Sequence, residues 1–104
     1  MSDELTKNIK TPSIEINGKS YVMPLLNGNI LTTIENELGC GLDGLRELFQ
    51  SKQISTLRTL VWAILVDEYP ELTIGEVGKA IKLKNLSEVS NKVFTVVELS
   101  LSEK

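Results

Sequence analysis

The segment 55–81 constrains the fold of this chain most, because it joins a helix that is apolar on nearly every side to a strongly marked start of a second helix. Apolar residues recur at helical spacing from Leu57 to Tyr69, and Pro70 then ends the helix. A helix with so little polar surface needs cover from its own domain or from another protein. We therefore predict a central helix capped by Ser55.

The central helix has two apolar stripes. The first stripe consists of Leu57, Leu60, Val61, Ile64 and Leu65, and the second consists of Trp62, Val66 and Tyr69. Side chains three and four residues apart share a helix face, so the two stripes together cover most of the helix. We expect Trp62 to be buried and to support the fold.

The next helix begins with several redundant signals. Thr73 is placed to cap it, with Glu76 at the third helical position as the partner in a capping box. Leu72 and Val77 occupy the two positions of a hydrophobic staple, which fixes the angle at which the chain enters the helix. The pattern predicts a helix over 74–83.

A β-hairpin is predicted near the N-terminus. Two short apolar runs, 14–16 and 19–23, flank Asn17-Gly18, the dipeptide that best supplies the positive φ angles of a type I′ turn. With a two-residue turn, one face of the hairpin carries Ile14, Ile16, Tyr21 and Met23. An isolated hairpin is marginally stable, so this face must pack on the helices or contact a partner.

Three further helices follow from apolar spacing and end signals. The first spans 29–38 and is closed by Gly39, a C-terminal cap. The second spans 42–49. The last spans 88–101 and is started by Ser87.

These elements define a mainly α (α+β) fold. Residues 1–11 are polar and aperiodic, which is typical of a flexible arm. Residues 12–104 form a single domain, with a hairpin at 13–25 and a compact bundle of about five short helices at 29–101.

Composition excludes several classes of protein. The chain has 104 residues, of which 41% are hydrophobic, and this is typical of one globular domain. Its net charge of −3 argues against a nucleic-acid surface, because phosphate binding depends on clustered Lys and Arg. The longest apolar run, 60–66, is too short to span a membrane, and residues 1–4 lack the basic start of a signal peptide. We expect a cytoplasmic protein.

The usual routes to nucleophilic, metal or nucleotide chemistry lack their parts in this sequence. There is no histidine, and the single cysteine, Cys40, has no second thiol with which to hold a metal. No Gly-rich phosphate loop is present. Asp67 and Glu68 are adjacent on a helix and diverge, so they do not build a facing carboxylate pair. We expect no catalytic residue, no cofactor, no metal and no small-molecule substrate: the protein is not an enzyme.

Two segments resemble other families and suggest other functions. The segment 38–45 resembles the attachment site of acyl carrier proteins, but the position of the modified serine is Gly44, which excludes a working carrier. The runs 73–81 and 87–93 have the rhythm of a helix-turn-helix, although Lys82 replaces the usual turn glycine. A small DNA-binding regulator is therefore the alternative function, and it would bind DNA through Lys82, Lys84 and Lys92.

From Ile14 to about Val97 the chain resembles the tail assembly chaperones of long-tailed bacteriophages and gene transfer agents. The resemblance is carried by the N-terminal hairpin, by the segment 34–39, by the apolar helix ending at 68–70 and by the segment 72–78. It implies a non-enzymatic protein in the cytoplasm of the bacterial host. Such a protein binds the tape measure protein, keeps it soluble and helps the tail tube protein to assemble around it.

A chaperone of this kind needs apolar surface beyond its own core. In the last helix a stripe of Val89, Val93 and Val96 faces the fold. The candidate partner-binding residues are those left over on that helix and on the hairpin, namely Phe94, Val97, Leu101, Tyr21 and Met23. Packing within the core and self-association remain alternative uses of the same side chains.

Overall fold

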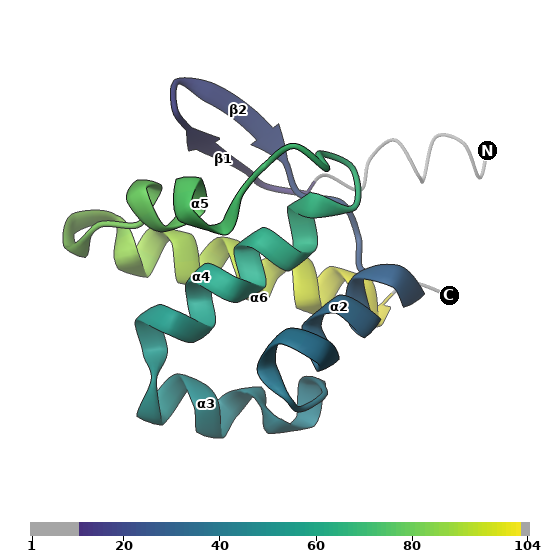
Figure 1. Cartoon of the computed structure of the whole chain (residues 1–104). Coiled ribbons are helices and arrows are strands. Elements are labelled where there is room, and N and C mark those ends of the chain that lie inside the picture. Colours follow the sequence, from purple (N-terminus) through teal and green to yellow (C-terminus); the bar gives the residue numbers. More distant parts are fainter. Residues whose placement is uncertain (1–10, 103–104) are drawn as a thin grey trace.

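The computed structural model describes residues 11–102, in which a two-stranded antiparallel hairpin precedes five α-helices (Figure 1). The mainly helical α+β fold predicted from the sequence is thereby confirmed. The predicted flexible arm, residues 1–11, lies outside the described residues except for its last member.

The hairpin has the predicted turn and register. Strand β1 (Ser13–Ile16) pairs with β2 (Lys19–Val22), and Ile14 lies opposite Tyr21. The two turn residues, Asn17 and Gly18, have φ angles of 55° and 79°, as a type I′ turn requires. Because the register is fixed, Ile14 and Ile16 both point into the core.

Helix α2 (Gly28–Leu38) begins one residue before the predicted start and ends at the predicted residue. The Asn27 side chain accepts a hydrogen bond of 3.0 Å from the backbone of Ile30, which caps the first turn. Gly39 adopts a left-handed φ of 75° and closes the helix.

The predicted helix 42–49 is a 3₁₀ turn, η1 (Leu42–Gly44), followed by helix α3 (Leu45–Ser51). Helix α4 (Gln53–Val66) begins almost at once, with only Lys52 between the two helices. The prediction of Ser55 as the cap of α4 is wrong, because the carbonyl of Lys52 already accepts a helical hydrogen bond from Thr56.

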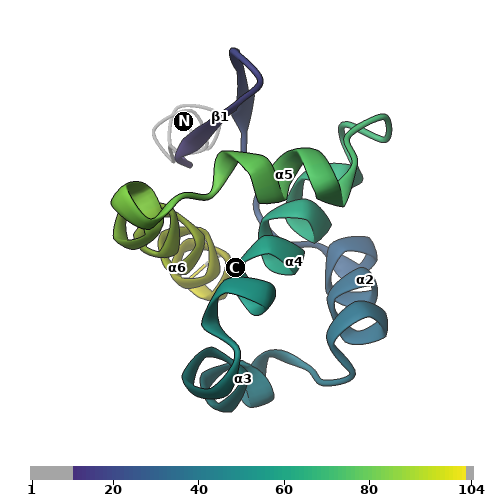
Figure 2. The same cartoon turned by 60° about the vertical axis from the view of Figure 1, so that its left-hand side comes forward.

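Helix α4 is the centre of the molecule. It packs against α2, α3, α5 and α6, which surround it in the view of Figure 2. The five members of its first stripe are fully buried, as predicted: Leu57, Leu60, Val61, Ile64 and Leu65.

The second stripe of α4 is only half-buried, which corrects the expectation for Trp62. Its indole Nε1–H donates a hydrogen bond of 3.0 Å to the carbonyl of Leu72, in the loop that follows the helix. The indole therefore fixes this loop with its polar edge while its apolar body covers the core. Val66 and Tyr69 are likewise half-buried.

Helix α5 (Ile74–Ala80) has the predicted capping box, since Thr73 accepts from the Glu76 backbone at 3.1 Å and Glu76 accepts from the Thr73 backbone at 3.0 Å. The helix ends at Ala80, three residues before the predicted end at 83. A 3₁₀ turn, η2 (Leu83–Asn85), leads into α6 (Leu86–Ser102).

The start of α6 differs from the prediction because of Asn85. Helix α6 begins at Leu86, so Ser87 lies inside it rather than capping it. The Asn85 side chain accepts a hydrogen bond of 2.7 Å from the Lys82 backbone and donates one of 3.0 Å to the carbonyl of Ala80. These two bonds determine the path of the chain between α5 and α6.

Side chains from distant parts of the sequence connect the elements. The amide of Leu26 donates to the hydroxyl of Ser100 at 2.8 Å, which joins the segment before α2 to the end of α6. Asn17 donates to the Glu76 carboxylate at 3.0 Å, which joins the hairpin turn to α5. The hairpin and the helices therefore enclose one core cluster.

Candidate functional site

Helix α6 has one buried face, and its exposed side carries large apolar residues among polar ones. Val89, Val93 and Val96 are buried, as the sequence predicts. On the other side of the helix, Phe94 is 43% exposed and Leu101 is 72% exposed. Because the buried stripe already supplies the contact of α6 with the core, that contact does not require Phe94 or Leu101.

The exposed face of α6 continues into a groove against α3. The groove has a volume of about 430 Å³ and is lined mainly by apolar groups, from Leu45, Arg46, Phe49, Gln50, Phe94 and Val97. The rings of Phe49 and Phe94 lie 5.1 Å apart and tilted, so the two aromatic rings join the helices across the groove. We call these six residues, together with Leu101, the α3–α6 surface.

The sequence did not point to the contribution of α3. Leu45 and Phe49 lie one turn apart, which predicts only that they share a helix face. Leu45 is buried and Phe49 is half-buried against the core. That this face borders Phe94 depends on how α3 and α6 each pack on α4, and no local pattern in the sequence reveals it.

The hairpin residues proposed for partner contact have a different environment. Met23 has no exposed surface and belongs to the core. Its backbone N–H donates to the carbonyl of Pro12, so the strand pairing continues past Val22 and keeps the Met23 side chain on the same face as Tyr21. Tyr21 is half-buried, and its ring packs edge-on against Tyr69 at 4.8 Å. The apolar hairpin face is therefore covered by the helices, and Met23 offers no surface to a partner.

Reactive groups are dispersed in the part of the chain that the structure describes. Within residues 11–102 no three Cys, Asp or Glu side chains come together as a metal site would require. Cys40 is half-buried. The pKa of Glu76 lies below its usual value of 4.5, chiefly because the Thr73 backbone N–H donates to its carboxylate. The lowered pKa of Glu76 is therefore a consequence of its role in capping α5.

Comparisons with protein-family models, with curated proteins and with solved structures found no match to this chain. No helix within residues 11–102 is both long enough and apolar enough to cross a membrane.

Proposed function

We propose that this protein is a tail assembly chaperone of the long-tailed phage type, which binds the tape measure protein and keeps it soluble while the tail tube assembles. The observation that carries the proposal is the α3–α6 surface, where Phe94 and Leu101 are exposed on a helix whose core contacts are already complete. An exposed apolar side chain that borders an apolar groove, as Phe94 does, is typical of a protein–protein contact.

The shape of the surface suits a helical client. An amphipathic helix binds in a groove through apolar side chains spaced three and four residues apart. The α3–α6 groove is lined by aliphatic and aromatic groups, with Arg46 and Gln50 as polar members. We propose that one apolar face of a tape measure helix binds here and that Arg46 contacts its polar flank.

The charges on α6 support the chaperone over the DNA-binding regulator. Its exposed positions include Glu88 and Glu98, and Lys92 forms an ion pair of 3.3 Å with Glu88. A recognition helix needs cations or amides free to approach phosphates and base edges.

The proposal is tested by co-expression with the tape measure protein that it expects to be encoded beside this chain. The parent chain is expected to move the client into the soluble fraction, and Phe94→Ser or Leu101→Ser to reduce that fraction, because each substitution removes apolar contact area from the binding surface. Ile54→Ser is the matched control, since Ile54 is 52% exposed but lies outside the α3–α6 surface. All three variants are to be checked by thermal unfolding.

Two results would count against the chaperone. The first is equal client solubility with the parent, the surface variants and the control. The second is tight, sequence-specific binding of duplex DNA that weakens steeply with salt and depends on Lys82, Lys84 and Lys92. The second result would establish the alternative function instead.

A further inference from the structure

A second groove, distinct from the α3–α6 surface, lies between the hairpin and the connection from α5 to α6. It has a volume of about 460 Å³. Its charged lining groups are Lys79, Lys82, Lys84 and Lys92 against Glu15 and Glu88. The groove is thus locally basic in a chain whose net charge is −3. We call it the basic groove.

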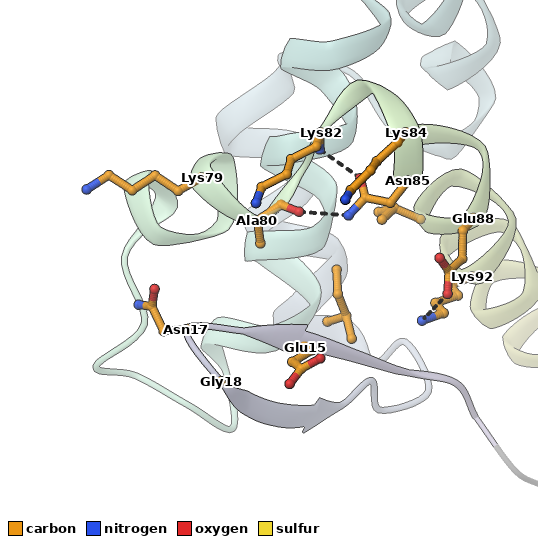
Figure 3. Close-up of a pocket in the computed structure, with 12 residues that line it drawn as sticks. Glu15, Asn17, Gly18, Lys79, Ala80, Lys82, Lys84, Asn85, Glu88 and Lys92 are labelled. Atoms are coloured by element: carbon orange, nitrogen blue, oxygen red, sulfur yellow. Dashed lines mark hydrogen bonds and ion pairs between the residues drawn. The ribbon is translucent and has the colours of Figure 1, made fainter.

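The backbone turn that carries two lysines of the basic groove is fixed by hydrogen bonds. The Asn85 side chain bonds to the Lys82 amide and to the Ala80 carbonyl, which fixes the turn that carries Lys82 and Lys84. Figure 3 shows both side chains running from this turn toward the hairpin, whereas Lys79 extends away at one end. Neither Lys82 nor Lys84 has an ion-pair partner within residues 11–102.

The opposite wall of the groove is the free edge of β1. The hairpin residues that line it come from β1 and the turn, and none comes from β2. Met23 donates to the Pro12 carbonyl at 3.0 Å, so this pair is a hydrogen-bonded pair of the ladder. Hydrogen-bonded pairs alternate along an antiparallel ladder, and therefore the N–H and C=O of Glu15 point away from β2. They have no hydrogen-bond partner within residues 11–102.

We propose that the basic groove binds an extended, acidic segment of another protein. The segment pairs its backbone with the free edge of β1 at Glu15, and its carboxylates lie beside Lys82 and Lys84. Addition of a strand to an exposed edge is an established mode of peptide recognition, in which alternate side chains supply specificity. The proposal concerns a surface separate from the α3–α6 surface and does not rest on the proposed function.

The position of Glu15 favours a peptide over a nucleic acid. A strand alternates its side chains between two faces, so it can place carboxylates near the lysines and a neutral residue beside Glu15. A nucleic acid carries a phosphate at every nucleotide, and its sugar–phosphate backbone has no N–H groups to pair with a strand edge.

The test is fluorescence anisotropy with a short fluorescein-labelled peptide of alternating glutamate and threonine. The double variant Lys82→Gln/Lys84→Gln is expected to bind roughly 4- to 20-fold more weakly, because exposed charge contacts each contribute only a few-fold. Lys52→Glu changes the net charge by the same amount at an exposed position outside the groove, and it should bind as the parent does. Binding to the parent should weaken as salt is raised.

A second pair of variants tests the strand edge separately from charge. Glu15→Pro removes the outward N–H but no hydrogen bond to β2, and Glu15→Gln removes the charge alone. The peptide should bind more weakly to Glu15→Pro than to Glu15→Gln, with hairpin integrity checked by circular dichroism. Equal binding by these two variants would overturn pairing with β1.

Three other outcomes would also overturn the proposal. Equal loss of binding in Lys52→Glu and in the double variant would mean that net charge alone attracts the peptide. Tighter binding of labelled duplex DNA than of the peptide at the same salt would assign the groove to nucleic acid. A concentration-dependent rise in molecular mass that the double variant abolishes would assign it to a second copy of this chain.

Discussion

Two glycines at the starts of neighbouring helices differ in what surrounds them. A Cβ added to Gly44 would lie 2.9 Å from the Cβ of Cys40, closer than real Cβ atoms approach other heavy atoms. A Cβ added to Gly28 would meet nothing within 4 Å. Gly44 stands where an acyl carrier protein has its modified serine. Its missing side chain leaves the space that Cys40 occupies.

We expect Gly28→Ala to raise the free energy of unfolding by about 0.5–1 kcal/mol, because alanine restricts the unfolded chain without a clash. Gly44→Ala should lower it by roughly 1–3 kcal/mol through overpacking. Chemical denaturation measures both changes. Adding Cys40→Gly to Gly44→Ala should recover part of the loss, and no recovery would show that the contact with Cys40 is not the cause.

At the scale of single elements, the capping box of α5 links helix formation to pH. The Thr73 backbone N–H lowers the pKa of Glu76 in the folded protein below 4.5. A carboxylate with a lowered folded-state pKa stabilises the fold above its unfolded pKa, and this contribution is lost as pH falls through the folded value.

Glu76→Gln should therefore lose less stability than the parent when pH is lowered from 7 through the region below 4.5. Urea unfolding at a series of pH values measures the difference. If the free energy of unfolding changed with pH in the same way for both proteins, the lowered pKa of Glu76 would be contradicted. Thr73→Ala should raise the pKa of Glu76 only in part, because the backbone N–H of residue 73 remains.

Elements with one dominant local signal were predictable, and helix starts at which neighbouring groups compete were not. The hairpin turn and the cap at Thr73 depend on neighbouring residues, and both are confirmed. The prediction failed at the starts of α4 and α6. There the backbone of Lys52 and the side chain of Asn85 override the serines that local preference favours.

At the scale of the whole molecule, spacing within one element was predictable, and packing between elements was not. Helical spacing separated buried Val93 from exposed Phe94 and Leu101, because one helix determines both faces. The participation of Phe49 depends on the packing of α3 beside α6. Burial of Met23 depends on the helices that cover the hairpin. Spacing within one element could predict neither the participation of Phe49 nor the burial of Met23.

Amide hydrogen exchange of the chain with and without the tape measure protein tests the central claim most directly. The amides of α3 and of the C-terminal half of α6 should exchange more slowly in the complex, because a bound helix suppresses local opening there. Exchange in the hairpin and in α2 should be unchanged. A complex whose protection lies elsewhere, with α3 and α6 exchanging as in the free chain, would contradict the assignment of this surface to the client.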